Sequence, residues 1–81
     1  MEVTVGTIVF SKAGRDKGNI LLVIKTEGNY AYVCDGNLRK TEKPKKKKLM
    51  HLQRTNYVLD IDEQNITNSQ VRKILAEYKP V

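Results

Sequence analysis

The sequence of 81 residues is poor in several residue types, with no tryptophan, one cysteine, one histidine and two prolines. The single cysteine, Cys34, excludes an internal disulfide and a multi-cysteine zinc site, and a lone thiol is typical of a reducing compartment. The longest apolar run, residues 20–24, is far shorter than the roughly 20 residues of a membrane-spanning helix, and the N-terminus lacks a signal segment. We therefore expect a cytoplasmic protein without a membrane partner.

Residues that could carry out catalysis are also scarce. His51 lies in an apolar run and Cys34 lies on a predicted strand, so both are expected to be structural. Asp60, Asp62 and Glu63 cluster together but lack the glycine and the spacing of a calcium loop, and no P-loop or dinucleotide fingerprint is present. We expect no enzyme activity, no metal site and no cofactor.

Positive charge is what the sequence has in excess. Fifteen Lys and Arg against nine Asp and Glu give a net charge of +6, so nucleic acid is the first partner to consider. The excess lies in residues 1–56, with twelve basic and five acidic residues (+7), whereas residues 57–81 hold three basic and four acidic ones (−1). The surface that binds a polyanion is therefore expected in the first segment.

The apolar pattern of the first segment predicts short β-strands. Runs at 6–11, 20–24, 30–34 and 49–52 are separated by polar stretches that contain glycine or asparagine. The run at 20–24 is apolar at every position, as in a central strand buried on both faces, and 26–29 predicts a hairpin turn. Four or five strands in about 55 residues indicate a small β-barrel.

The last segment predicts one helix, over about residues 68–78. Thr67 and Gln70 have the spacing of a capping box, and Ile66 and Val71 flank it at the positions of a hydrophobic staple. We expect the apolar face of this helix to pack on the barrel, and the alternative is that it binds a protein partner. That face consists of Val71, Ile74, Leu75 and Tyr78.

The loop between the first two predicted strands is one candidate RNA-binding element. Glycines at 14 and 18 let the backbone adopt positive φ and approach a phosphate closely, and three basic residues bring positive charge to the same place. A plain hairpin loop with solvated charges fits the spacing equally well. The candidate contacts are Ser11, Lys12, Gly14, Arg15, Lys17 and Gly18.

A basic stretch is the second candidate element. Seven of the ten residues from 39 to 48 are basic, and such a cluster repels itself unless anions lie nearby, so we expect a mobile arm in the free protein. The alternative is a solvated charge run without a ligand. The candidate contacts are Arg39, Lys40, Lys43, Lys45, Lys46, Lys47 and Lys48.

Aromatic side chains could stack on bases, and the candidates are Phe10, Tyr30, Tyr32 and Tyr57. In a chain with so few aromatics, each is expected to be a core or cross-strand residue instead. Because no aromatic RNA-recognition motif is present, we expect recognition of RNA shape and phosphate rather than of bases.

The stretch 6–24 resembles a KOW motif, the strand-loop-strand signature with a central glycine found in several ribosomal proteins and transcription elongation factors. The likeness extends to 33–36, 48–52 and 57–59, which resemble the KOW ribosomal proteins of the large subunit and small bacterial KOW-domain proteins. The resemblance implies an SH3-like barrel and binding to ribosomal RNA, with the loop from Ser11 to Gly18 among the RNA contacts.

We therefore expect a mainly β protein, a small SH3-like barrel of KOW type with a C-terminal α-helix. Residues 1–59 would form the barrel, and residues 60–81 would extend the same domain. We expect it to bind ribosomal RNA, associate with the large ribosomal subunit and act in translation. The alternative is a protein-binding adaptor like the KOW domains of elongation factors. A reader of peptides or methyl-lysine is the weakest option, because it needs several aromatics in one pocket.

Overall fold

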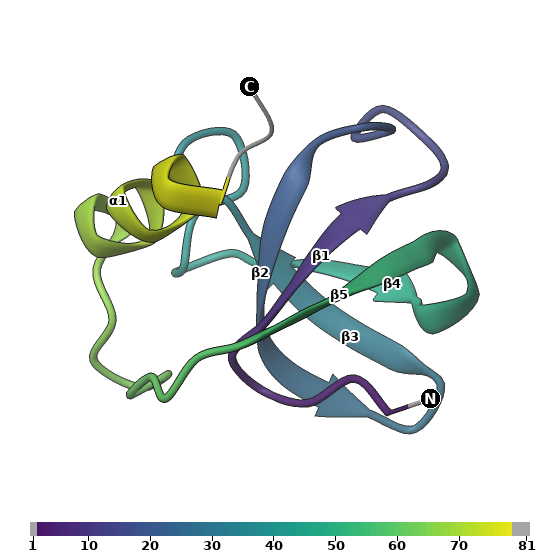
Figure 1. Ribbon diagram of the computed structural model, residues 1–81, viewed down its shortest axis with the longest axis horizontal. Helices are drawn as coiled ribbons and strands as arrows, with labels where there is room; N and C mark the ends of the chain where they lie inside the picture. Colours follow the sequence, from purple (N-terminus) through teal and green to yellow (C-terminus); the bar gives the residue numbers. More distant parts are fainter. Residues whose placement is uncertain (1, 79–81) are drawn as a thin grey trace.

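The computed structural model describes residues 2–78, which form a five-stranded sheet and one α-helix (Figure 1). All neighbouring strands are antiparallel, and their order across the sheet is β4-β3-β2-β1-β5. The fold is therefore mainly β with a C-terminal helix, as the sequence predicts. The elements are β1 (Thr7–Ser11), β2 (Ile20–Glu27), β3 (Tyr30–Cys34), β4 (Lys45–Lys48), β5 (Leu52–Val58) and α1 (Asn68–Tyr78).

The sheet is curled but not closed. A single 3-10 turn, Leu49–His51, carries the chain from β4 at one edge to β5 at the other. Breaks in register, between Thr7 and Val9 and between Val23 and Lys25, add bulges that bend and twist the strands. Within the described residues, β4 pairs only with β3 and β5 only with β1. The predicted barrel is therefore not confirmed, and the described residues form a curled, open sheet.

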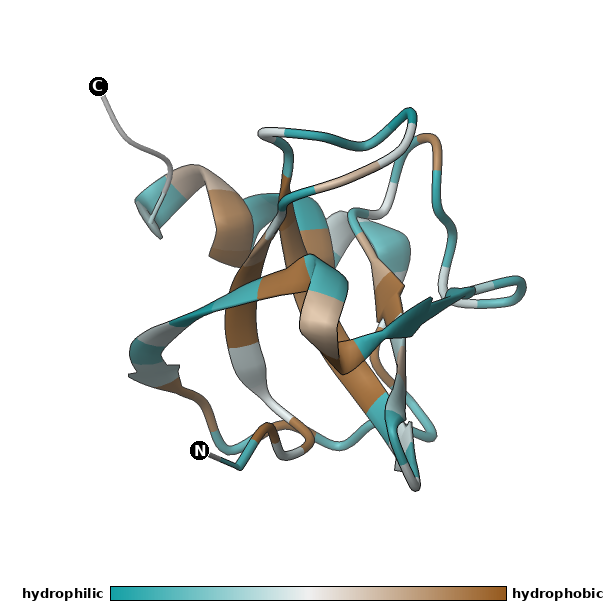
Figure 2. Cartoon of the chain, turned by 90° about the vertical axis from the view of Figure 1, so that its right-hand side faces the viewer, coloured by the Kyte–Doolittle hydropathy of each residue, from teal (hydrophilic) through white to brown (hydrophobic). Residues whose placement is uncertain are grey.

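Apolar side chains form two clusters, one on each face of the sheet. Successive residues of β2 alternate between the clusters, because neighbouring side chains of a strand point to opposite faces. This explains why the run 20–24 is apolar throughout, and Figure 2 shows hydrophobic segments along the central strands and hydrophilic loops around them. The cluster on the helix side contains Ile8, Leu22, Ile24, Cys34, Val71 and Leu75, and the other contains Val9, Leu21, Val23, Ala31, Val33 and Leu52.

Helix α1 covers one face of the sheet. The predicted capping box forms, because the Gln70 amide donates to Thr67 Oγ1 at 3.1 Å and the Thr67 amide donates to Gln70 Oε1 at 2.9 Å. Val71 and Leu75 are buried in the cluster on that side of the sheet. The predicted bounds of the helix are confirmed, and Val71 and Leu75 pack on the sheet as expected, while Ile74 and Tyr78 are half-buried.

Two local predictions are wrong. The expected strand at 49–52 is a 3-10 turn followed by β5, because Leu49 and Leu52 lie three residues apart and pack in the same cluster. The basic stretch is not a mobile arm, because Lys45–Lys48 forms β4 and pairs with β3 from Val33 to Tyr30. The contacts that make a strand of four lysines possible are described below.

Candidate nucleic-acid interface

The two candidate binding elements meet in space. They are the β1–β2 loop (residues 12–19) and the β3–β4 connection (residues 35–44), which lie in the upper half of Figure 1. Arg39 of the connection donates to Asp16 of the loop twice, from Nε to Oδ1 at 3.3 Å and from Nη2 to Oδ2 at 3.2 Å. Because a two-pronged Arg–carboxylate pair fixes orientation as well as distance, it holds the two elements in one arrangement.

Lys47 of β4 lies beside the same carboxylate. Together with Ser11, Arg39 and Asp16 it forms a polar cluster beneath the two loops. Its side chain is only 9% exposed, and its Nζ donates to Ser11 Oγ at 2.9 Å and to the Ala13 carbonyl at 3.0 Å. Asp16 Oδ2 lies 3.7 Å from the same ammonium, so three acceptors surround a group with three donors. Burial of a lysine is tolerated here because it is both hydrogen-bonded and paired with an acid.

These contacts explain how a run of lysines forms a strand. Side chains alternate between the two faces of a strand, so Lys47 points towards Asp16 and Ser11, while Lys46 and Lys48 point to the opposite face. Lys45, Lys46 and Lys48 are exposed to solvent. The sequence does not predict that Lys47 is buried, because four identical residues show no alternation. The one feature that points to a buried cation is Asp16, an acid among the basic residues of the loop.

The β1–β2 loop is tight, and its glycines have the predicted conformation. Gly14 and Gly18 have φ of +76° and +84°, a region that favours glycine. The Gly18 amide donates to the Ser11 carbonyl at 2.8 Å, and the Ser11 amide donates to the Asn19 carbonyl at 3.0 Å. The loop therefore projects its exposed basic residues from a fixed backbone: Lys12, Arg15 and Lys17.

Helix α1 positions the β3–β4 connection. Gly36 has a φ of +77°, and a Cβ at this position would overlap the carbonyl oxygen of Asn68. Arg72 Nη1 donates to the Gly36 carbonyl at 2.6 Å, while the Asn68 side chain accepts from the Thr41 amide at 2.8 Å and donates to Glu42 at 2.7 Å. The helix thus holds the connection at one side, and Asp16 holds it at the other.

Ten of the thirteen predicted RNA contacts are exposed, and three are not. Ser11 and Lys47 are buried and Arg39 is half-buried, and all three bond within the cluster around Asp16. The polar groups of Ser11 and Lys47 are therefore already bonded within the chain, and Arg39 uses two of its guanidinium N–H groups on Asp16. The exposed residues are Lys12, Gly14, Arg15, Lys17, Gly18, Lys40, Lys43, Lys45, Lys46 and Lys48.

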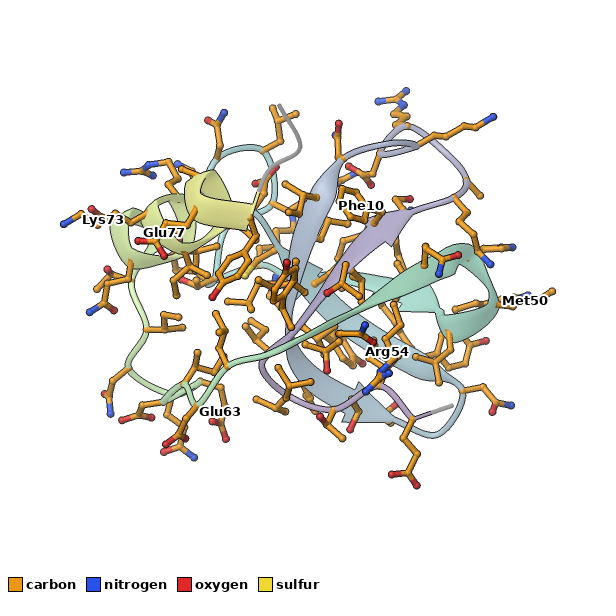
Figure 3. All side chains as sticks on the ribbon, viewed as in Figure 1. Phe10, Met50, Arg54, Glu63, Lys73 and Glu77 are labelled. Carbon is orange, nitrogen blue, oxygen red and sulfur yellow. The ribbon has the colours of Figure 1, made fainter. Side chains whose placement is uncertain are left out.

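Two glutamates of the acidic segment 57–81, Glu63 and Glu77, lie away from the β1–β2 loop. Figure 3 shows Lys73 and Glu77 on the outer side of α1, pointing away from the sheet, and Glu63 below them on the connection from β5. A polyanion that approaches the β1–β2 loop therefore does not meet these two glutamates first.

The aromatic candidates occupy three different places. Tyr30 and Tyr32 lie half-buried on β3, with Lys46 Nζ at 4.5 Å and 5.9 Å from their ring centroids. Tyr57 packs against Tyr78, with the ring centroids 4.4 Å apart. Phe10, labelled at the end of β1 in Figure 3, lines a groove of about 490 Å³ between the β1–β2 loop and α1. The expected cross-strand contacts are present for Tyr30 and Tyr32, whereas Tyr57 is 51% exposed and Phe10 lies in neither core cluster.

Cys34 is buried completely, and the pKa of its thiol is raised to about 12 by burial and then by the carboxylates of Asp35 and Glu42. The thiol is therefore protonated at neutral pH, which is the opposite of what a nucleophile requires. Residues 2–78 include no group of three or more His, Cys, Asp or Glu that could hold a metal ion. The same part of the chain has no helix long and apolar enough to cross a membrane.

The sequence was also compared with known proteins. No protein-family model matches it, and no curated protein matches it either. The functional conclusion therefore depends on the residues and geometry described above.

Proposed function

We propose that this chain is a non-catalytic RNA-binding protein that holds structured RNA through the β1–β2 loop and the β3–β4 connection. The observation that carries the proposal is the pairing of Arg39 and Lys47 with Asp16, which joins two exposed basic elements into one surface. Preformed surfaces lose less conformational entropy on binding than mobile arms, because their side chains are ordered in advance.

Phosphate is the group that this surface suits best. Exposed lysines and arginines from both elements attract phosphates and release counterions when they bind. Gly14 and Gly18 carry no side chains, so a phosphate can approach the loop backbone closely while the neighbouring basic side chains contact it. Gly18 has no atom within 4 Å of the place a Cβ would occupy, so that side of the loop is open.

The resemblance to KOW proteins specifies the proposal further. Five antiparallel strands in this order, with a 3-10 turn joining the two edge strands, are compatible with an SH3-like barrel that is open on one side. We therefore propose a KOW-type domain that binds ribosomal RNA and associates with the large ribosomal subunit.

Crosslinking in cells, followed by sequencing of the RNA attached to the protein, tests this proposal. Reads concentrated on one site of large-subunit ribosomal RNA are the expected result. Reads scattered over many transcripts would keep RNA binding but remove the ribosomal assignment. Absence of crosslinked RNA would overturn the proposal and favour the protein-binding adaptor.

A loop variant tests whether the β1–β2 loop takes part. Gly14→Val places a β-branched side chain at a φ of +76°, which distorts the loop at a cost of about 1 kcal/mol or more. We expect weaker RNA binding by a variant that remains folded by circular dichroism. Undiminished binding by that folded variant would remove the loop from the interface.

A further inference from the structure

The face of the sheet that carries the two β3 tyrosines has its own chemical character. Two cross-strand rows cross this face, one with Lys25, Tyr32 and Lys46, the next with Glu27, Tyr30 and Lys48. Each tyrosine therefore has a lysine of β4 directly beside it, and Tyr32 has a second lysine on β2. We call the two tyrosines with the three lysines the tyrosine–lysine face.

The lysines of this face lie over the rings. Lys46 Nζ is 4.5 Å from the Tyr30 centroid, and Lys25 Nζ is 5.0 Å from the Tyr32 centroid. Both tyrosines are half-buried, and all three lysines are exposed. Each ring is therefore partly exposed beside a lysine, although Lys46 also pairs with Glu27 at 3.5 Å and Tyr32 packs against the helix-side cluster.

Two structural roles account for part of this pattern. Cross-strand aromatic pairs stabilise sheets, and lysines on an edge strand such as β4 discourage pairing with another chain. Neither role requires Lys25, which lies on a central strand, to be placed over the same aromatic rings. The combination of partly exposed rings and flanking cations is typical of surfaces that bind single-stranded nucleic acid.

The spacing of the rings indicates which form of RNA fits. Tyr30 and Tyr32 are two residues apart on one strand, a separation of about 6.8 Å along its axis. Bases stacked in a duplex follow one another at about 3.4 Å along each strand, so two neighbouring stacked bases cannot each lie on one of these rings. An extended strand with unstacked bases can.

We propose that the tyrosine–lysine face binds an unpaired, single-stranded segment of RNA, with bases stacked on Tyr30 and Tyr32. This proposal rests on the proposed function and names a second part of the ligand, next to the structured part held by the loops. β4 leads directly out of the β3–β4 connection, so the basic surface continues from Lys40 and Lys43 along the strand. On binding, Lys25 and Lys46 move from the rings to the phosphates.

The test compares two RNA probes and a set of matched variants. The probes are a short single-stranded RNA without self-complementarity and a blunt RNA duplex, each labelled for fluorescence anisotropy. Tyr30→Leu and Tyr32→Leu keep an apolar side chain but remove the ring, and Tyr30→Phe keeps the ring. Tyr57→Leu is the control, because Tyr57 lies on β5 at the opposite edge of the sheet.

We expect each Tyr→Leu change to weaken binding of the single strand about tenfold and to leave duplex binding unchanged. The slope of log affinity against log salt should stay the same, because phosphate contacts are retained. Tyr30→Phe and Tyr57→Leu should bind both probes like the unchanged protein. The single strand should also quench the tyrosine emission, which a chain without tryptophan shows clearly.

The failures of the two proposals are distinguishable. If the unchanged protein binds neither probe, the proposed function itself is overturned. If it binds both and the Tyr→Leu variants keep full affinity for the single strand, RNA binding stands and the tyrosine–lysine face is excluded. Equal loss for both probes, with a lowered melting temperature, would assign the tyrosines to stability and also overturn the inference.

Discussion

At the scale of single residues, Asp16 has the most unusual position. It is an acid in the centre of the most basic part of a basic protein, and it is almost fully buried. A partly buried carboxylate between two cations lowers their mutual repulsion and fixes their places. In the proposed function, Asp16 opposes RNA binding through its charge and favours it through the arrangement that it imposes.

Asp16→Asn separates these two effects. The substitution raises the net charge from +6 to +7, so simple electrostatic attraction predicts tighter RNA binding. We expect the reverse, a loss of about fivefold, because the two basic elements lose their shared anchor and the competent arrangement becomes less populated. Anisotropy titration with one structured RNA measures the difference.

Glu27→Gln is the matched control, since it makes the same change in charge at an exposed ion pair with Lys46 at 3.5 Å. Its RNA affinity should be unchanged or tighter, and its stability should change by less than about 0.5 kcal/mol. Asp16→Asn should lose about 2 kcal/mol, a decrease of roughly 10 °C in melting temperature. Tighter binding by Asp16→Asn would contradict the role of Asp16 as an anchor.

Cys34 gives a prediction about pH. Its folded pKa of about 12 lies above the ordinary thiol value of 9.0, so the unfolded chain loses this proton first as the pH rises. The contribution of the thiol to stability is thus complete below pH 9.0 and decreases between 9.0 and about 12, by up to about 1.4 kcal/mol per pH unit. Cys34→Ala should unfold in urea with a weaker dependence on pH over this range, and identical dependence in both proteins would contradict the assignment.

At the scale of elements, the helix is tied to both the core and the binding surface. Leu75 is 5% exposed in the cluster on the helix side, so Leu75→Ala should lower the free energy of unfolding by about 3 kcal/mol. Lys73→Ala, on the outer side of the same helix, should change it by less than about 0.5 kcal/mol. Chemical denaturation measures both, and equal, small effects would show that the helix does not contribute to the core.

The sequence predicts some elements well because their signals are local. The helix from 68 to 78 is predicted by its capping box and its apolar period, and β1 to β3 are predicted by β-branched runs between glycine turns. β4 is not predicted, because its stability comes from Asp16, about thirty residues away in the chain, and from pairing with Tyr30 and Tyr32. Long-range pairing of this kind leaves no period in four consecutive lysines.

The candidate site is predicted in the same uneven way. Residue type and charge identify which stretches carry positive charge, and glycine spacing identifies the loop with positive φ. Neither reveals that Lys47 faces inward, because its direction depends on the register of β4 with β3, nor that Arg39 and Ser11 bond in the same place, because their respective partners, Asp16 and Lys47, are distant from them in the chain. The tyrosine–lysine face is hidden for the same reason, since its rows combine residues from three strands.

At the scale of the whole molecule, charge is divided between two regions. The basic loops and β4 belong to the first 56 residues, which carry a net charge of +7, and the remaining segment carries −1. Such a division orients the protein as it approaches a polyanion and speeds the encounter at low salt. We propose that the exposed basic residues of both loops contact RNA phosphates together.

The most direct test is the salt dependence of RNA affinity, measured for the unchanged protein and for a variant with Lys12, Arg15 and Lys17 all replaced by alanine. About five phosphate contacts give a slope of log affinity against log salt near −4, and loss of up to three of them should bring the slope to about −2. Circular dichroism would confirm that the variant is folded. A slope near zero for the unchanged protein, or an equal slope for both proteins, would contradict the claim.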